Sequence, residues 1–443
     1  MNIYALSSGK GPSGIAIIRL SGKDALKVSE LISRRKNLKS KKVNLCKFYN
    51  PSNDKLIDEG LLLLFLSPNS FTGDDLVEFH IHGSNAVISY FLKVLSEQDN
   101  CRLAEPGEFT KIAFQNNKID LVEAESIGDL IHSETELQRQ QAVKLVQGNA
   151  SIYYNDLRKK LIKSLAFIEA KIDFAEDDLP ESVLGEVQKS IKKVHSDIKK
   201  ILENHKVGEK IRDGFRVSII GEVNAGKSSL LNLLSKRNAA IVSDEKGTTR
   251  DIIEVHLNID GYPVILADTA GIRESKNEIE KKGIKLALDK AEDADLKLIV
   301  IEAINVDFKG ILKELMNENA ILVVNKSDLI KEKLNLEIKK FEHVLISIKN
   351  NLNMEELILK IKNKLQGKFI SNEDILITRE RHRQHLVECM KNLKNFNNKY
   401  DTEDFDKAAE DLRLATRHLG MIVGKVDVEE ILGSIFNDFC IGK

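Results

Sequence analysis

The stretch GEVNAGKSS, residues 221–229, decides what kind of domain the middle of this chain forms. It fits the pattern GxxxxGK[ST], follows the apolar segment FRVSII and opens the helix-like segment SLLNLLSK. Gly221 and Gly226 allow the backbone to curl so that successive N–H groups face phosphate oxygens. Lys227 supplies a positive charge, and the Ser228 hydroxyl is a suitable Mg²⁺ ligand. We therefore predict a phosphate-binding loop between a strand and a helix.

The sequence after this loop predicts a doubly wound α/β domain. From Phe215 onward, apolar strand-like segments alternate with helical stretches; the segments are FRVSII, YPVILAD, LKLIVIEA, AILVVNK and HVLISI. This alternation is typical of a mostly parallel sheet with helices on both faces. We expect an inserted P-loop GTPase (Ras-like) domain over residues 213–368, because domain insertion is tolerated where the two termini of a domain lie close together.

Two further motifs at predicted strand ends indicate that the nucleotide is GTP. Asp268 in DTAG can hold Mg²⁺ through water, while the Gly271 N–H meets the γ-phosphate. In NKSD, residues 325–328, the Asp328 carboxylate can accept two hydrogen bonds from the guanine ring N–H and the exocyclic amine. Adenine offers no such pair of donors, so a site of this kind rejects ATP.

The loop SDEKGTTRD, residues 243–251, lies where a GTPase places its first switch segment. Thr249 is our candidate for the ligand that caps Mg²⁺ and the γ-phosphate. Many GTPases carry a glutamine directly after DxxG to orient water, but here Ile272 follows and cannot do so. Glu280 is the candidate replacement, and the alternative is that Glu280 is a surface glutamate on the following helix.

The nucleotide-binding residues predicted from these motifs form four groups along the chain: Asn224, Ala225, Gly226, Lys227, Ser228 and Ser229; Ser243, Asp244, Glu245, Lys246, Gly247, Thr248 and Thr249; Asp268, Thr269, Ala270 and Gly271; and Asn325, Lys326, Asp328, Ser347, Ile348 and Lys349.

Composition excludes some classes of function. The 67 Lys and Arg residues balance 68 Asp and Glu residues, so the net charge of −1 creates no global attraction for nucleic acid, and any RNA contact requires a local patch. RRKNLKSKK, residues 34–42, is the densest basic run, although such runs are typical of solvated surfaces. The four cysteines lack CxxC spacing, which argues against a zinc site.

Hydropathy indicates a protein without a membrane span. The longest apolar run, LLLLFL at residues 61–66, is far shorter than the roughly 18 residues of a membrane helix. We expect it to form a buried strand. The first residues, MNIYALSSGKG, lack the cationic start and apolar stretch of a signal peptide, so we expect a cytoplasmic location.

The flanking sequence predicts two further domains. Residues 1–117 mix strand-like segments such as GIAIIRL and LVEFHIH with the helical segment NAVISYFLKVLSE, which indicates an α+β domain. Residues 118–212 and 369–443 are rich in amphipathic helical patterns, and the first of these ranges is interrupted at AEDDLPES. We expect them to form one discontinuous helical domain that ends in the motif CIGK.

The combination of motifs resembles the MnmE (TrmE) family of tRNA-modifying GTPases over essentially the whole chain. The resemblance rests on GIAIIRLSG, SFTGDDLVEFHIHG, PGEFTKIAFQNNKIDL, NAGKSSLLN, SDEKGTTRD, DTAGIRE and the terminal FCIGK. It implies an N-terminal folate-binding and dimerising α+β domain, a discontinuous helical domain and an inserted G domain.

The resemblance also implies an activity, cofactors and partners. A homodimer would hydrolyse GTP with K⁺ and Mg²⁺ while a carboxymethylaminomethyl or aminomethyl group is added to carbon 5 of the wobble uridine, position 34, of certain tRNAs. The carbon would come from 5,10-methylene-tetrahydrofolate or 5-formyl-tetrahydrofolate. The partner would be the flavoprotein MnmG in a heterotetramer.

By motif match, the resemblance assigns roles to particular residues. The K⁺ ligands would be Asn224, Ser243, Glu245 and Thr248, the Mg²⁺ ligands Ser228 and Thr249, and the folate contacts Arg19, Glu78, Lys118 and Lys443. A K⁺ ion there would neutralise charge between the β- and γ-phosphates, as an arginine finger does elsewhere.

Cys440 is the second predicted catalytic residue, besides Glu280. The family folds its tail into the dimer centre near the folate, so Cys440 could act on uridine as a nucleophile or as an acid, with Lys443 lowering the pKa of the thiol. The alternative is a structural thiol.

Two other functions stay open at this point. A regulatory GTPase switch of the ribosome-assembly type would share the nucleotide motifs but would have no need of a folate site or a terminal cysteine. A plain folate-dependent carbon-transfer enzyme with an appended GTPase would act without a flavoprotein.

Overall fold

The computed structural model describes residues 1–443 except 174–180, 204, 223, 238–253, 269–291, 305–310, 331–337, 370–375, 401–403, 427–431, 433–434, 437–438 and 443. The chain forms two compact units. The first unit contains residues 1–128, 145–163 and 413–443, and the second contains residues 129–144 and 164–412. Among the described residues, no helix is both long enough and apolar enough to cross a lipid bilayer.

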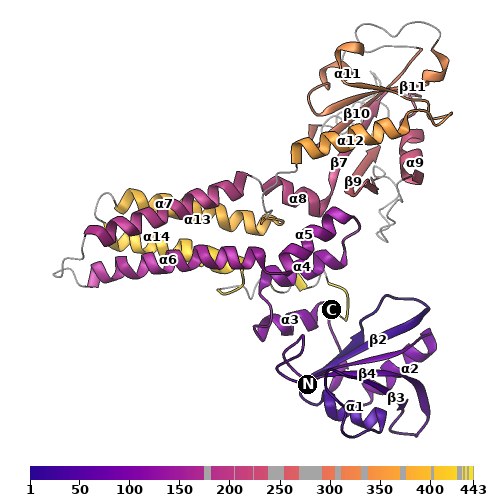
Figure 1. The fold of residues 1–443 in the computed structure, drawn as a ribbon, viewed down its shortest axis with the longest axis vertical. Coiled ribbons are helices and arrows are strands. Elements are labelled where there is room, and N and C mark those ends of the chain that lie inside the picture. Colours follow the sequence, from indigo (N-terminus) through magenta and orange to yellow (C-terminus); the bar gives the residue numbers. More distant parts are fainter. Residues whose placement is uncertain are drawn as a thin grey trace, which may run out of the picture. The chain divides into compact units, whose positions relative to one another are not determined.

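A six-stranded, mostly antiparallel sheet forms the N-terminal part of the first unit (Figure 1). Its strand order is β3-β4-β5-β2-β1-β6. Its strands are β1 (Asn2–Leu6), β2 (Ser13–Ser21), β3 (Val43–Tyr49), β4 (Leu56–Phe65), β5 (Leu76–Gly83) and β6 (Cys101–Leu103). Only β1 and β6 are parallel. The expected α+β character of this region is confirmed.

The two faces of this sheet differ in how they are covered. Helices α1 (Ala25–Ser33) and α2 (Asn85–Ser96) cover one face, and the core between them and the sheet includes Ile18, Phe48 and Phe79. On the opposite face, α3 (Glu108–Gln115) covers a small cluster of residues around Phe109. None of the residues that the structure describes covers the apolar part of that face around Val43 and Leu45.

The prediction of a buried strand for residues 61–66 is therefore only half right. Residues 61–65 belong to β4, where Leu62 and Leu64 are fully buried while Leu61 is 38% exposed. Side chains alternate between the faces of a strand, and an apolar run does not reveal that only one of its faces is covered.

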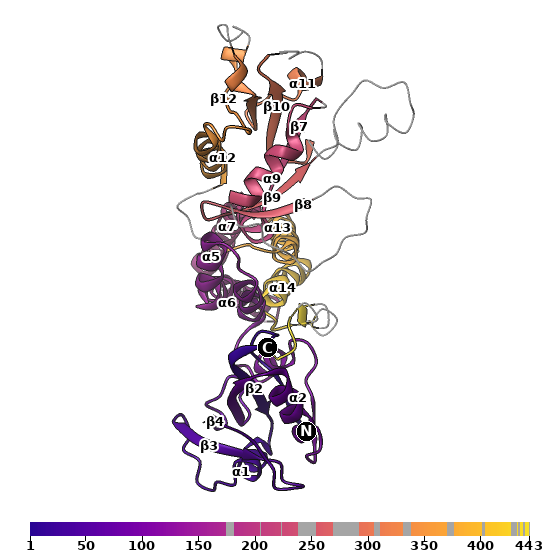
Figure 2. The ribbon, with the colours of Figure 1, turned by 90° about the vertical axis from the view of Figure 1, so that its right-hand side faces the viewer.

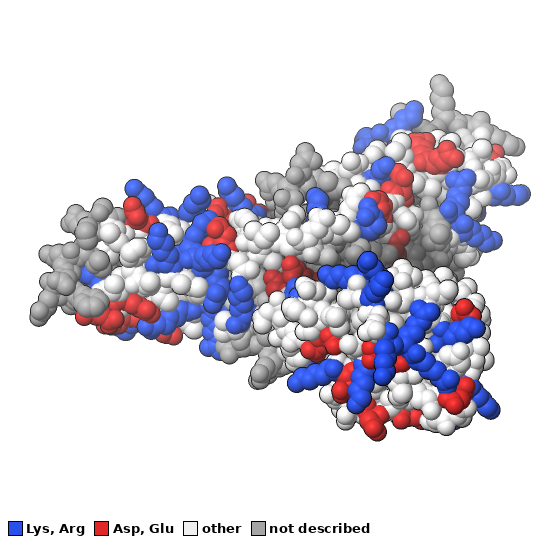
Figure 3. Space-filling view, turned by 60° about the horizontal axis from the view of Figure 1, so that its bottom comes forward, with Lys and Arg blue, Asp and Glu red and all other residues white. Residues whose placement is uncertain are grey.

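We call the uncovered apolar part of the sheet the open face; it consists of Ile15, Ile17, Val43, Leu45, Leu61 and Leu63. Strand register places these residues in rows, because Leu45 pairs with Leu61 and Val43 pairs with Leu63. Val43 and Leu45 are 65% and 57% exposed. Figure 3 shows the N-terminal domain with basic and acidic side chains distributed over it.

The first unit also contains parts of helices α4 and α6 and the C-terminal tail. Helix α4 (Leu121–Ile131) follows α3, and α6 (Asn149–Asp173) begins in this unit. Phe436 and Phe439 of the tail pack with Leu121 and Ala124 of α4. Gly128 faces the Phe439 ring so closely that an added Cβ would lie 3.1 Å from it.

A second six-stranded sheet, in the order β12-β11-β10-β7-β9-β8, forms the α/β domain of the second unit. Its strands are β7 (Phe215–Gly221), β8 (Glu254–Ile259), β9 (Tyr262–Asp268), β10 (Leu296–Glu302), β11 (Ala320–Asn325) and β12 (His343–Leu345). All neighbouring strands are parallel except β8 and β9. This confirms the predicted doubly wound, mostly parallel sheet.

Helices lie on both faces of this sheet. Helices α8 (His205–Asp213), α9 (Lys227–Arg237) and α12 (Met354–Phe369) share one core with residues such as Val217, Leu298 and Val323. The opposite core includes Ile220 and Ile299 together with Leu312 of the short α11 (Ile311–Glu314). Two short 3₁₀ helices, η1 (Ser327–Leu329) and η2 (Ile338–Lys340), complete the described elements of this domain.

The remaining helices are α5 (Glu136–Val146), α7 (Glu181–Glu203), α13 (Glu380–Tyr400) and α14 (Phe405–Ile422). Helices α7 and α13 lie side by side in both ribbon views (Figures 1 and 2). The Tyr400 hydroxyl donates to the Leu184 carbonyl at 3.2 Å, which joins their ends. The predicted helical character of residues 118–212 and 369–443 is confirmed for the described residues.

Candidate functional site

The phosphate-binding loop connects β7 to α9, as predicted. Gly226 has φ of +102°, and an added Cβ would lie 2.4 Å from the Asn325 side-chain nitrogen, so only glycine fits here. The Lys227 side chain is 7% exposed, and its Nζ donates to the carbonyls of Gly221 (3.1 Å) and Glu222 (2.8 Å). The backbone of the loop therefore folds around the ammonium group that is expected to bind phosphate.

The structure brings three predicted nucleotide-binding segments together. The Asn325 Nδ2 donates to the Ala225 carbonyl at 2.9 Å, and its Oδ1 accepts from the Ile348 N–H at 3.3 Å. Asn325 is 4% exposed and follows β11 directly. Its side chain therefore fixes the phosphate-binding loop and the segment of residues 347–349 relative to the NKSD motif.

The other described residues of this site stand around that junction. Ser347 is fully buried and its Oγ accepts from the Asn350 N–H at 3.2 Å. Lys326 forms an ion pair with Glu302, the last residue of β10. This ion pair was not predicted from the sequence. The exposed residues of the set are Asn224, Ser228, Ser229, Asp328 and Lys349.

Part of the predicted nucleotide site lies outside the described residues. These residues are Ser243, Asp244, Glu245, Lys246, Gly247, Thr248, Thr249, Thr269, Ala270, Gly271 and Glu280. The backbone of Asp268 is described, and it pairs with Ile219 at the carboxyl end of β9. The structure therefore describes the strand-end position of the predicted Mg²⁺ site. The switch segment of that site lies outside the described residues.

The predicted folate contacts Arg19 and Glu78 lie side by side in register on β2 and β5. The Arg19 Nη2 donates to the Glu78 Oε1 at 2.8 Å, and each side chain is 16% exposed. The guanidinium carbon also lies 5.8 Å from the Phe71 ring centroid and 5.7 Å from that of Phe109. The ion pair is thus flanked by two aromatic rings.

Lys118 approaches the same loop from another direction. Its Nζ donates to the Pro68 carbonyl at 2.8 Å, and an added Cβ on Gly73 would lie 3.3 Å from the Lys118 Cγ. Because Phe71 lies between Pro68 and Gly73, the loop that contacts Arg19 also contacts Lys118. The structure therefore gathers three of the four predicted folate contacts; Lys443 lies outside the described residues.

The C-terminal tail is tied to the N-terminal sheet instead of being left free. Ile441 forms an antiparallel bridge with Pro106, and the Ser7 Oγ donates to the Gly442 carbonyl at 2.8 Å. Gly442 has φ of +98°, and an added Cβ would lie 2.2 Å from the Leu6 carbonyl oxygen. Only glycine allows the tail to approach β1 this closely.

This tether fixes the position of Cys440, whose side chain is exposed. The Cys440 carbonyl accepts from the Gly107 N–H at 3.5 Å. Gly107 is the residue before α3, and Phe109 in the first turn of α3 contacts Arg19. The tail cysteine and Arg19 of the Arg19–Glu78 pair therefore both lie at the N-terminal end of α3, although they are more than 400 positions apart in the sequence.

Two family models together match nearly the whole chain. The model "GTP-binding protein TrmE N-terminus" matches residues 2–118, and the model "MnmE helical domain" matches residues 121–440. The chain belongs to the MnmE family of tRNA modification GTPases. The predicted family resemblance and the predicted three-part fold are thereby confirmed.

Full-length MnmE relatives agree with this assignment. The tRNA modification GTPase MnmE of Pelagibacter ubique is 65% identical over 443 residues and covers 100% of both chains. That of Rickettsia bellii is 44% identical over 445 residues, covering 100% of this chain and 99% of the relative.

Among solved structures, the G domain of the T. maritima FeoB iron transporter is 27% identical over 34% of this chain and 99% of that chain, with a TM-score of 0.28.

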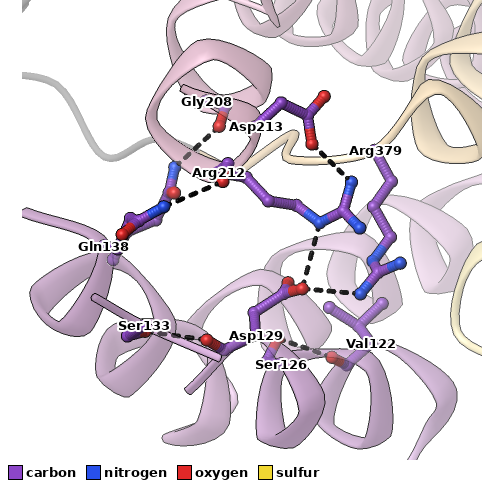
Figure 4. Close-up of polar contacts among 10 residues, drawn as sticks. Val122, Ser126, Asp129, Ser133, Gln138, Gly208, Arg212, Asp213 and Arg379 are labelled. Atoms are coloured by element: carbon purple, nitrogen blue, oxygen red, sulfur yellow. Dashed lines mark hydrogen bonds and ion pairs between the residues drawn. The ribbon is translucent and has the colours of Figure 1, made fainter. Parts of the chain in front are cut away.

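Sequence reasoning missed one polar cluster in this MnmE chain (Figure 4). The Asp129 Oδ1 accepts from the Arg212 Nε at 3.0 Å and from the Arg379 Nη2 at 2.7 Å. The Arg212 carbonyl in turn accepts from the Gln138 side chain at 3.0 Å. Arg212 precedes β7 and Arg379 precedes α13, so one carboxylate joins the segment that enters the α/β domain to the segment that follows it.

Proposed function

We propose that this chain uses GTP hydrolysis to drive addition of a carboxymethylaminomethyl or aminomethyl group to carbon 5 of the wobble uridine, position 34, of certain tRNAs. The observation that carries this proposal is the tether of the C-terminal tail. It holds Cys440 beside Gly107 at the N-terminal end of α3, where Phe109 contacts Arg19. A GTPase that serves only as a regulatory switch has no use for such an arrangement.

The nucleotide half of the proposal rests on the junction at Asn325. A GTP molecule would place its phosphates on the loop of residues 224–229 and its guanine against Asp328. Mg²⁺ would be held by Ser228 and Thr249, and K⁺ by Asn224, Ser243, Glu245 and Thr248. Glu280 would orient the attacking water.

The folate half rests on an unsatisfied atom beside the Arg19–Glu78 pair. The His80 Nε2 is buried and has no hydrogen-bond partner among the described residues. It lies 3.6 Å from the Glu78 Oε2, which is too long for a hydrogen bond. Glu78 could accept the amino and ring N–H groups of a pterin, and Arg19, Lys118 and Lys443 could bind its glutamate tail. A bound methylene- or formyl-tetrahydrofolate would supply the one-carbon unit.

Cys440 would act on the uridine in this site. As a thiolate, its sulfur would add to carbon 6 and activate carbon 5; as a thiol, it would donate a proton instead. Its exposure in this chain gives a substrate access to it in either role.

A homodimer would cover the open face of the N-terminal sheet. Four of its apolar side chains, Ile15, Val43, Leu45 and Leu61, are between 38% and 65% exposed, and contiguous exposed apolar surface often marks a protein interface.

The proposal also includes the flavoprotein MnmG as a partner in a heterotetramer, and a cytoplasmic location. The domain boundaries after residues 117, 212 and 368 belong to the same proposal.

Nucleoside analysis of bulk tRNA tests the proposed function. Cells that lack the gene should lose the modified wobble uridine, and cells that carry it should retain the modification. Unchanged wobble uridines in the deletion strain would favour the regulatory switch.

A further inference from the structure

The N-terminal domain contains a long basic segment with no acidic residue. Residues 31–53 carry seven cations, although the chain as a whole has slightly more acidic than basic residues. The seven are Arg34, Arg35, Lys36, Lys39, Lys41, Lys42 and Lys47, and all are exposed. Most of them lie in the connection between α1 and the edge strand β3.

Asn44 holds this connection in a fixed shape. Its Nδ2 donates to the carbonyls of Lys39 (3.2 Å), Lys42 (2.9 Å) and Leu62 (3.2 Å), and its Oδ1 accepts from the Lys39 N–H at 3.2 Å. The Lys41 N–H also donates to the Leu64 carbonyl at 2.8 Å. We call residues 34–42 the clamped loop, because Asn44 and β4 together fix its backbone.

The backbone of the clamped loop is in an unfavourable conformation at two positions. Arg34 and Lys41 have φ of 53° and 57°, a left-handed region that residues other than glycine, asparagine and aspartate rarely adopt. Backbone strain of this kind persists only where the surroundings enforce it, and it concentrates at functional sites.

Four lysines of the clamped loop project without a partner in the described part of the chain. Arg34 pairs with Asp54 and lies 4.2 Å from the Tyr49 ring centroid. In contrast, the side chains of Lys36, Lys39, Lys41 and Lys42 form no hydrogen bond or ion pair with any described residue. Their charges are therefore not compensated within the domain.

Two simpler explanations account for less of this pattern. Lysine on an edge strand discourages aggregation, but this explains only Lys47, because the other cations precede β3. Basic residues on a solvated helix face are usually interleaved with acidic ones, as the lysines of α7 are with Glu186 and Asp197. The clamped loop has no such interleaving.

We propose that the clamped loop binds the phosphate backbone of the tRNA substrate. Phosphate contacts by lysine fix the position of a nucleic acid without reading its sequence, and their strength comes from released counterions. The inference rests on the proposed function, since it requires that RNA is the substrate. Figure 3 shows basic side chains projecting from the N-terminal domain, where they could meet an RNA molecule.

Binding of fluorescently labelled tRNA to the full-length chain, measured between 50 and 200 mM KCl, tests the proposal. Each lysine–phosphate contact contributes about 0.7–0.9 to the slope of log affinity against log salt. The triple variant Lys39→Ala, Lys41→Ala, Lys42→Ala should bind at least about tenfold more weakly at 100 mM KCl, with a slope shallower by about 2. The variant Asn44→Ala keeps every cation but frees the loop, and its affinity should lie between those of the wild type and the triple variant.

The matched control removes three exposed lysines elsewhere: Lys93→Ala, Lys339→Ala, Lys340→Ala. This control should retain wild-type affinity and slope, and all variants should hydrolyse GTP at the wild-type rate. Equal affinity and slope in the clamped-loop triple and the wild type would overturn this inference alone. A wild-type chain that neither binds tRNA nor modifies it would overturn the proposed function and this inference together.

Discussion

Asp129 and Arg379 lie 250 positions apart in the sequence, yet their side chains form a direct ion pair of 2.7 Å. The same carboxylate oxygen binds Arg212, which lies three positions before β7. The far end of β7 leads into the phosphate-binding loop. Asp129 therefore links the segment just before β7 to the residue that precedes α13.

Replacing Asp129 with Asn should destabilise the second unit. The amide keeps an acceptor but removes the negative charge that faces the two guanidinium groups, although Arg212 retains its ion pair with Asp213 at 2.8 Å. Asp129 and Arg379 are 15% and 18% exposed, so after allowance for solvent screening we expect a loss of about 1–3 kcal/mol in the free energy of unfolding. Urea unfolding followed by circular dichroism measures this loss.

The control for that experiment is Asp156→Asn, which breaks the exposed ion pair between Asp156 and Lys160 on α6. Pairs of this kind contribute at most about 0.5 kcal/mol. Equal stability of the Asp129 and Asp156 variants would show that the cluster in Figure 4 does not hold the two segments together.

Replacing Gly442 with Ala should release the C-terminal tail. The residue has φ of +98°, and the new Cβ would collide with the Leu6 carbonyl oxygen. We expect backbone hydrogen exchange in the tail to accelerate by roughly tenfold, because the left-handed conformation costs a residue with a Cβ about 1–2 kcal/mol. GTP hydrolysis should be unchanged, while tRNA modification should fall.

Gly185→Ala in α7 is the matched change, since an added Cβ there meets no atom within 4 Å. Alanine is the better helix former, so this variant should leave the tail and the modification untouched. Wild-type hydrogen exchange in the Gly442 variant would contradict the tether.

Alkylation with iodoacetamide at pH 8 should label Cys440 before the other cysteines. Burial raises the pKa of the Cys46, Cys101 and Cys389 thiols, so their reactive thiolate fraction at pH 8 is smaller than that of an ordinary cysteine. Cys440 is exposed. Mass spectrometry of the folded chain at early times identifies the labelled site, and prior labelling of Cys101 would contradict the prediction.

GTP hydrolysis should be faster in K⁺ than in Na⁺. A charge placed between the β- and γ-phosphates is worth about 10³–10⁵ in rate where an arginine supplies it, so we expect at least about a tenfold difference between the two salts. The variant Asn224→Ala should lose the difference, because it removes the proposed side-chain ligand. Equal wild-type rates in both salts would remove K⁺ from the mechanism.

The sequence was sufficient to predict the features that depend on local pattern. The loop at Gly226 requires particular residues at fixed spacing, and the buried strands β7, β10 and β11 are continuous apolar runs. The position of Asn325 at a strand end followed from the same alternation.

Features that depend on distant segments were not predictable in this way. No local pattern connects Asp129 with Arg379 or Gly442 with Leu6, because these contacts exist only once the chain has folded. The prediction that residues 61–66 are buried was partly wrong for a related reason. Whether Leu61 is covered depends on which other segments pack over β4, and the sequence of β4 does not specify them.

The most direct test of the account compares tRNA modification by Cys440→Ser with that by Cys101→Ser, using purified chains supplied with GTP, reduced folate and the flavoprotein partner. Both variants should hydrolyse GTP at the wild-type rate. We predict that Cys440→Ser leaves the wobble uridine unmodified while Cys101→Ser modifies it normally. Full modification by Cys440→Ser would contradict the claim that the tethered tail thiol takes part in the chemistry.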